Sequence, residues 1–220
     1  MMDAAEFSRE MKSLLASKIS GQKINDEQLL RTLNKVQNNT LPKEAKDEDK
    51  LAFWLNLYNG FTNWKLLFDN LRQSVKEQPD FFTEKGIMIE GVSLSLDDIE
   101  HGILRHNRPR KNGITLNDWS SPTHTLFHMP FDYRIHFALN CGARSCPPIA
   151  FYQGCSLDAQ LSMAEAHFIS EGFMVDLENR IIECNAIFNW YRDDFEHGFL
   201  NDSRYLDFEV HILPYNWNFI

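Results

Sequence analysis

Apolar side chains recur every three or four positions over residues 7–15 and again over residues 29–36. This spacing places them on one face of a helix, so both stretches are predicted to be amphipathic helices. Asn25 or Asp26 is the expected N-cap of the second helix, because a short polar side chain can accept bonds from the first free N–H groups. A polar loop then leads to a third helix, about residues 47–70.

The third helix is apolar on nearly every side, which predicts that the rest of the fold encloses it. Asn56, Asn59 and Asn63 nevertheless fall at i, i+3 and i+7, on one face. A buried amide without partners costs about 1–3 kcal/mol. We therefore expect these amides to hydrogen-bond an irregular loop; the alternative is a solvent-facing strip on a partly buried helix.

The second half of the chain predicts shorter elements and a small, mainly antiparallel sheet. In chain order we expect strands at 87–90 and 92–94, a short helix starting at Ser95, an irregular stretch at 106–130 with one strand at 114–116, a strand at 134–140, a helix at 157–170, a hairpin turning at 178–179, a helix at 185–195 and a final strand. This pattern predicts a helix-rich α+β fold. We expect a single domain over 1–220, in which a helical extension at 1–40 packs on a core at 45–220.

The composition excludes several function classes. The 220 residues carry a formal net charge of -9, so nucleic acid and anionic membranes would be repelled. The first residues do not form a signal peptide, and no stretch approaches the roughly 18 apolar residues that span a bilayer. Four irregularly spaced cysteines do not form a disulfide framework. An acidic, reduced, cytoplasmic protein is the expectation.

The stretch RIHFALNCGARSCPPI at 134–149 places two thiols after a predicted strand. Side chains alternate along a strand, so His136 and Cys141 would point to opposite faces. We expect the strand to break just after Asn140 and to bring the sulfur and the imidazole together. Gly142 makes such a break feasible, because glycine accepts positive φ.

Cys141 is favoured over Cys146 as a nucleophile, because acyl chemistry needs backbone N–H groups facing the developing oxyanion. Residues 142–145 are expected to offer free N–H groups after Cys141, whereas Cys146 precedes two prolines, which have none. Proline suits the first turn of a helix, so an N-capping role for Cys146 stays open.

Two histidines are candidate bases. His136 is nearest in sequence, and His101 follows Glu100, a carboxylate that could orient an imidazole. Such arrangements are recognised by geometry, and the alternative is that each residue is an ordinary buried side chain. We interpret Cys155 and Cys184 as packing residues.

A zinc site is a rival interpretation, in which Cys141 and Cys146 bind the ion with His136 or His101. No second close pair of ligands supports it. Neither a metal nor another cofactor is therefore expected.

Five blocks carry a resemblance to a known family. They are LAFWLNLYNGFT at 51–62, LSLDDIEHGILR at 94–105, RIHFALNCGARSCPPI at 134–149, IFNWYRDDF at 187–195 and PYNWN at 214–218. In this order the blocks resemble the family catalogued as domain of unknown function 547. The resemblance implies a single α+β domain, and similarity to the papain and transglutaminase class of cysteine enzymes is the structural analogy that we draw from it.

Two functional hypotheses follow. In the first, the protein is a cysteine hydrolase or acyl-transfer enzyme acting on an unidentified small molecule or peptide, with Cys141, His136, Glu100 and His101 as catalytic residues. Its substrate-binding candidates are Arg144, for an anionic group, with Asn56, Asn59 and Asn140 at the active loop. In the second, the buried Asn, His and Cys side chains only fix a loop, and the protein is a binding or scaffold module.

Overall fold

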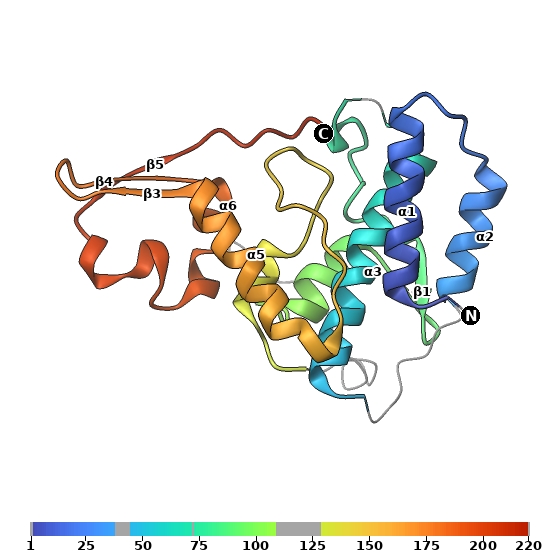
Figure 1. Ribbon diagram of the computed structural model, residues 1–220, viewed down its shortest axis with the longest axis horizontal. Coiled ribbons are helices and arrows are strands. Elements are labelled where there is room, and N and C mark those ends of the chain that lie inside the picture. Colours follow the sequence, from blue (N-terminus) through green and yellow to red (C-terminus); the bar gives the residue numbers. More distant parts are fainter. Residues whose placement is uncertain (1, 38–44, 72, 109–128, 220) are drawn as a thin grey trace.

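The computed structural model describes residues 2–37, 45–71, 73–108 and 129–219, and it has the α+β architecture predicted from the sequence (Figure 1). Its α-helices are α1 (Ala4–Ile19), α2 (Asp26–Gln37), α3 (Asp47–Phe68), α5 (Leu157–Gly172) and α6 (Ala186–Trp190). The predicted helices at 7–15, 29–36, 47–70 and 157–170 are confirmed. Asn25 caps α2 by accepting a hydrogen bond from the Glu27 N–H at 2.9 Å.

Helix α3 is the centre of the larger core, and α1 lies along it (Figure 1). The two helices approach closely because Gly60 has no side chain. A Cβ built at this position would lie 2.6 Å from the Phe7 ring of α1. Trp64, one turn further along α3, donates its indole N–H to the Leu29 carbonyl oxygen of α2 at 3.0 Å. The first 37 residues thus pack on α3.

The described residues form two small sheets. Strands β1 (Ile87–Ile89) and β2 (Val92–Leu94) form an antiparallel hairpin. In the second sheet, β3 (Phe173–Asp176) pairs antiparallel with β4 (Ile181–Cys184), and β5 (Glu209–Ile212) pairs parallel with β4. The chain then runs back from this projecting sheet toward the end of α3 (Figure 1), where Asn218 forms an isolated bridge with Ser74.

A second, aromatic core lies between α5, α6 and the β3–β4 hairpin. Its buried rings include Phe137, Phe168, Phe188 and Phe195. Phe137 and Phe195 stack with their centroids 5.8 Å apart. Ile135, two residues earlier, belongs to the first core, so the segment around residue 136 lies between the two cores.

The predicted strand at 134–140 is wrong. Residues Tyr133–Phe137 form a 3₁₀ helix, η3. The Asp132 carboxylate starts this helix by accepting a bond from the Arg134 N–H at 2.9 Å, a common capping interaction. Three successive side chains, those of residues 135–137, are buried, because neighbouring packing covers both sides. Buried and exposed side chains therefore do not alternate here as they would in a strand. The predicted strand at 114–116 lies outside the described residues.

Asn56 and Asn59 of α3 hold the irregular chain that follows η3, as predicted from their spacing, whereas the prediction is wrong for Asn63. Asn59 donates to the Ala138 carbonyl oxygen at 3.0 Å and accepts from the Asn140 N–H at 2.8 Å. Asn56 makes the same reciprocal pair with the Tyr152 backbone at 2.8 and 3.0 Å. All three asparagines of this face are buried. The Asn63 amide has no hydrogen-bond partner within the described chain.

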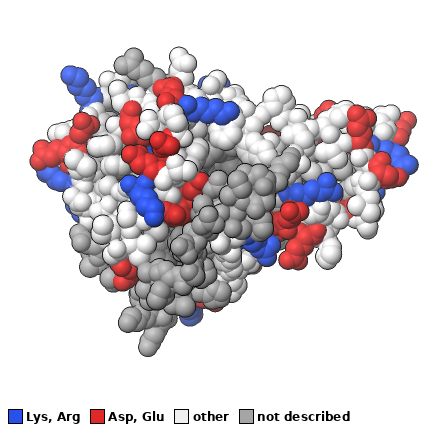
Figure 2. Space-filling model, turned by 180° about the vertical axis from the view of Figure 1, so that it is seen from behind, with Lys and Arg blue, Asp and Glu red and all other residues white. Residues whose placement is uncertain are grey.

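The surface carries no broad basic patch on the described part of the face in Figure 2, where Lys and Arg side chains lie scattered among Asp and Glu. This arrangement fits the acidic composition. Within the described ranges, no helix combines the length and apolarity that crossing a bilayer requires.

Replacing Asn59 with alanine should lower the free energy of unfolding by about 2–4 kcal/mol, because the change leaves a buried carbonyl and a buried N–H without partners. Urea denaturation measures the difference. Asn63→Ala, one turn further along the same face, is the matched control and should change stability by no more than about 1 kcal/mol, since it breaks no bond within the described chain. Equal losses in the two variants would show that the amide bonds do not hold the loop.

Candidate functional site

A cavity of about 290 Å³ lies where the two cores meet, and it brings the four sequence-predicted catalytic residues together. Cys141, His136, Glu100 and His101 all line it, as does Cys146. The other lining side chains are Tyr58, Phe82, Asp97, Leu139, Ile187, Trp190, Tyr191, Tyr215 and Trp217. Both thiols are partly exposed. The roles of these residues stay predictions; their common location is a property of the fold.

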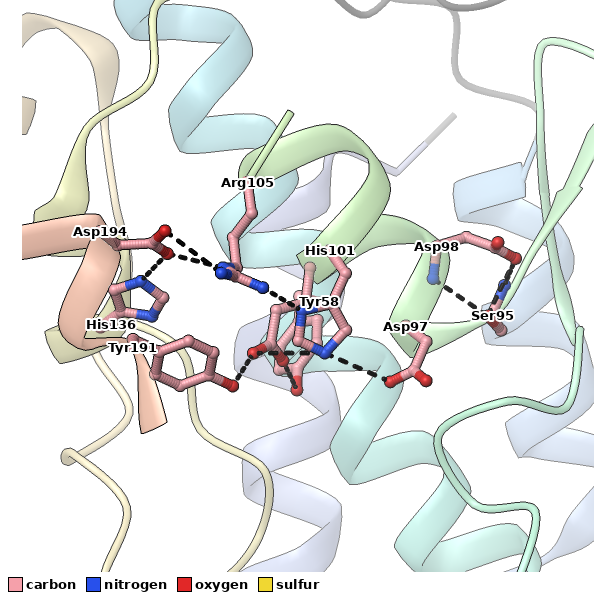
Figure 3. A network of polar contacts seen from close by, with 10 residues as sticks. Tyr58, Ser95, Asp97, Asp98, His101, Arg105, His136, Tyr191 and Asp194 are labelled. Atoms are coloured by element: carbon pink, nitrogen blue, oxygen red, sulfur yellow. Dashed lines mark hydrogen bonds and ion pairs between the residues drawn. The ribbon is translucent and has the colours of Figure 1, made fainter. Parts of the chain in front are cut away.

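A π-helix, η2 (Asp98–Leu104), positions Glu100 and His101. Ser95 and Asp98 start it with reciprocal hydrogen bonds of 2.8–3.0 Å, and the predicted start of a short helix at Ser95 is thereby confirmed. The Arg105 N–H bonds the Glu100 carbonyl oxygen five residues back at 2.8 Å, which is the π-helical connection. π-Helices are rare and frequently occur at functional sites. Glu100 and His101 line the cavity, whereas Arg105 does not. The Arg105 side chain reaches instead to Asp194 (Figure 3).

Glu100 is held by two tyrosines. The Tyr58 hydroxyl donates to Oε2 at 2.8 Å and the Tyr191 hydroxyl donates to Oε1 at 2.5 Å. Burial opposes ionisation of Glu100, but the nearby His101 and the two hydroxyl donors outweigh it and keep the pKa of Glu100 below its ordinary value. Burial, together with this carboxylate, raises the pKa of both tyrosines well above the ordinary value. The group is therefore a carboxylate between two neutral phenols.

The hydrogen bonds of His101 define its tautomer. Arg105 donates from Nη1 to Nδ1 of His101 at 3.0 Å, and a guanidinium has no acceptor. Nδ1 must therefore carry the lone pair, and Nε2 carries the hydrogen. Nε2 lies 3.7 Å from Asp97 Oδ1 and 4.0 Å from Glu100 Oε1. His101 thus presents an N–H to the carboxylates of the cavity.

His136 has a different partner, Asp194 from the 3₁₀ helix η5 (Arg192–Phe195) (Figure 3). Its Nε2 lies 2.7 Å from Asp194 Oδ2, and its ring stacks on Tyr191 at 3.9 Å. Burial lowers the pKa of His136, although Asp194 opposes the shift. The neutral ring therefore donates from Nε2 to the carboxylate, which leaves Nδ1 as the basic atom.

The Asp194 carboxylate also receives the Arg105 side chain. Nε and Nη2 donate to its two oxygens at 2.6 and 3.1 Å. Burial opposes the charge on Asp194, but the bonds from His136 and Arg105 outweigh it and hold the pKa of Asp194 at about 2. Asp194, rather than the predicted Glu100, is thus the carboxylate that orients His136.

The two thiols form a pair in which Cys146 is the acceptor. The Cys141 N–H lies 3.2 Å from Cys146 Sγ, and the Tyr215 hydroxyl lies 3.1 Å from Cys146 Sγ and 3.5 Å from Cys141 Sγ. Burial opposes ionisation of Cys146, but hydrogen bonds from Cys141 and Tyr215 outweigh it and lower its pKa. The bond to Cys146, with burial, raises the pKa of Cys141 well above the ordinary value. The first thiolate therefore forms on Cys146.

The expectation of free N–H groups after Cys141 is wrong for three of the four residues. The Gly142 N–H bonds Asn140 Oδ1 at 2.8 Å. The N–H groups of Arg144 and Ser145 bond the carbonyl oxygens of Asn218 and Asn216 at 2.9 and 3.3 Å. The Gly142 N–H is thus occupied by a local side chain. The other two N–H groups are occupied because the C-terminal segment returns alongside the loop, a long-range contact that the local sequence does not reveal. Gly142 does adopt the expected positive φ, 87°.

The predicted substrate-binding residues do not line this cavity. Asn56 and Asn59 bond the backbone behind the thiol loop, and Asn140 donates to the Pro147 carbonyl oxygen at 2.6 Å. Arg144 is exposed and donates to the Phe219 carbonyl oxygen at 2.9 Å. These positions make the asparagines loop supports and place Arg144 outside the cavity.

Two predictions concern the other cysteines. Cys184 is buried, as expected for a packing residue, but Cys155 is exposed, so its predicted packing role is wrong. No group of three or more potential metal-ligating residues occurs within the described chain.

Sequence reasoning missed four side chains of the site, and each of them has a partner far away in the sequence. They are Arg105, Asp194, Tyr191 and Tyr215. Asp194 is 58 positions from His136, and Tyr215 is 69 positions from Cys146. All four lie within the sequence blocks that carry the family resemblance, which is the signal that could have directed attention to them.

A family model described as "Protein of unknown function, DUF547" matches residues 42–169. The chain belongs to the DUF547 family. The matched region contains both thiols, both histidines and Glu100. The resemblance at 187–195 and 214–218, where Asp194 and Tyr215 lie, extends beyond the match and stays a prediction for this DUF547 protein. No curated protein and no solved structure matches the chain, so the analogy to papain and transglutaminase also stays a prediction.

Acidification should destabilise the protein in two stages. The unfolded histidine takes up a proton near pH 6.5, whereas the folded His136 has a lowered pKa and resists protonation. The folded state therefore binds fewer protons, and the free energy of unfolding falls as the pH drops below about 6.5, by about 1.4 kcal/mol per unit of pKa difference. Asp194, with a folded pKa of about 2, adds a second loss from about pH 4 downward.

Urea denaturation from pH 7 to pH 5 tests the first stage. His136→Gln should flatten the pH dependence, because it removes the group that titrates only in the unfolded state. His167→Gln, on the exposed side of α5, is the matched control and should retain it. An unchanged slope in the His136 variant would contradict a neutral buried imidazole.

Proposed function

We propose that this protein is a cysteine-dependent hydrolase or acyl-transfer enzyme whose reaction takes place in the cavity of about 290 Å³. One observation carries the proposal: a pair of partly exposed thiols shares this cavity with a histidine that is bonded to a buried carboxylate. A thiol, an imidazole and an orienting carboxylate are the groups that nucleophilic acyl chemistry requires. A solely structural thiol would not need to line a cavity.

Cys146 is the nucleophile in this proposal. The sequence favours Cys141, but the hydrogen bonds favour Cys146, because the Cys141 N–H and the Tyr215 hydroxyl approach its sulfur and stabilise the thiolate. The thiolate is the reactive form of cysteine. Cys141 keeps its proton and supports the charge on its neighbour.

His136 is the acid–base group. Its Nε2 is bound to Asp194, so Nδ1 is available to take a proton. His101 is less suited, because its Nδ1 accepts from Arg105 and its other nitrogen carries hydrogen. The thiol proton moves to Nδ1, the sulfur forms a bond to the carbonyl carbon, and the resulting imidazolium returns the proton to the leaving group as the carbonyl–heteroatom bond breaks. Water or an acceptor nucleophile then cleaves the thioester and regenerates the thiol.

Tyr215 is a donor for the developing oxyanion. Its hydroxyl lies within hydrogen-bonding distance of both sulfurs, and burial raises its pKa, so it stays protonated. When the negative charge moves from the sulfur to the substrate oxygen, the hydroxyl can donate its hydrogen bond to that oxygen instead. Because the N–H groups of residues 142, 144 and 145 are occupied, this side chain supplements the remaining backbone donor of Ala143.

Iodoacetamide labelling tests the nucleophile. Cys146 should react about tenfold or more faster than Cys141 at neutral pH, because only Cys146 has a lowered pKa. Its labelling rate should rise with pH and reach half of its maximum below the pH found for the exposed Cys155 in the same sample. Peptide mapping by mass spectrometry separates the three rates.

Cys141→Ser and His136→Gln serve as the comparison variants. Serine at 141 keeps the N–H donor and a hydroxyl donor, so Cys146 should still label with a low half-maximal pH. His136→Gln should leave that alkylation largely intact, because the thiolate is stabilised by other groups. Labelling of Cys146 only after denaturation would end the enzyme proposal and leave the binding or scaffold module as the interpretation.

A further inference from the structure

Aromatic rings form much of the cavity wall. Trp190, Tyr215 and Trp217 form a cluster in which Tyr215 lies 4.7 Å from each indole, and the two indoles stack at 5.7 Å. Tyr191 adds a further ring at the side of His136. Ring faces carry negative potential and attract cations within about 6 Å of the centroid. Lys76 Nζ already lies 4.6 Å from the Trp217 centroid, which shows that a ring of this cluster accepts a cation.

Carboxylates supply the charge of the same cavity. Asp97 and Glu100 line it, and no Lys or Arg is among the described residues that do. Arg105, a buried cation that does not line the cavity, is paired with Asp194. His136 is neutral, and the tyrosine hydroxyls stay protonated. His101, whose Nε2 lies 3.7 Å from Asp97 and 4.0 Å from Glu100, is held by Arg105 in its neutral tautomer. The balance of the described lining groups is therefore negative even before a thiolate forms.

We propose that this cavity binds a cationic ammonium group, and that the substrate is a small acyl compound carrying such a group near its reactive carbonyl. The substrate assignment rests on the proposed function, whereas the binding of the cation does not. An anionic ligand would be repelled by the two carboxylates and by a thiolate, whereas a cation would be attracted by the same groups. The cavity lies at the small end of ligand pockets, which fits one small head group rather than a folded partner.

The experiment compares choline with its neutral isostere 3,3-dimethylbutan-1-ol by isothermal titration calorimetry on the wild-type protein. The two probes have the same shape, so the difference reports charge. We expect choline to bind at least about tenfold more tightly, because the charge gains both the carboxylates and the ring faces. Equal affinities, or no choline binding at millimolar concentration, would overturn the proposal.

Variants locate the binding. Asp97→Asn and Trp190→Leu should each weaken choline binding about fivefold or more and leave the isostere unchanged, since one removes a charge and the other removes a ring face. Glu178→Gln removes one negative charge at the exposed β3–β4 turn and should not alter either affinity. A loss in Glu178→Gln equal to that in Asp97→Asn would mean that only net charge matters and would overturn the cavity as the site.

The choline titration and the thiol labelling test the two proposals separately, so one proposal can be rejected while the other is retained. Choline binding without reactive Cys146 would retain the cation site and reject the enzyme. Reactive Cys146 without choline preference would retain the thiol chemistry and reject the substrate class. Protection of Cys146 from iodoacetamide by choline, but not by the isostere, would support both.

Discussion

The ion pair between Arg105 and Asp194 is the interaction on which the site depends. It joins the π-helix of the larger core to the helix η5 of the aromatic core. Both partners are almost fully enclosed, with side chains only 2% and 1% exposed. A buried ion pair is favourable only when its remaining hydrogen-bonding groups are also satisfied. The two histidines meet this condition, since His101 accepts from Arg105 and His136 bonds Asp194.

This arrangement gives the two histidines opposite properties. Arg105 donates to the lone pair on Nδ1 of His101 and so occupies it. Asp194 accepts from the Nε2–H of His136, which leaves the lone pair on Nδ1 of that ring available. One ion pair thus separates a donor imidazole from an acceptor imidazole in the same cavity. Loss of either charged partner would alter both tautomers together, so their contributions cannot be separated by single substitutions.

Local sequence patterns predicted the side chains that hold the thiol loop in place better than they predicted the side chains that set the chemistry of the cavity. The spacing of Asn56 and Asn59 on an apolar helix required polar partners nearby, and burial on α3 made those partners backbone groups. The alternation at 134–140 gave a false strand, because two cores cover η3 from both sides. The sequence could not identify Asp194, because the two neighbouring aspartates look alike in it. In the structure Asp193 is exposed, whereas Asp194 packs against His136, which is 58 positions away in the sequence.

The cavity combines two requirements that oppose each other. A thiolate on Cys146 gains from the donors around it but is repelled by Asp97 and Glu100, which line the same space. Coulomb interactions between such charges reach several kcal/mol at short range in a partly buried site. An ammonium group bound among the rings would reverse this repulsion and lower the thiol pKa further. In that case the ligand itself would complete the activation of the nucleophile.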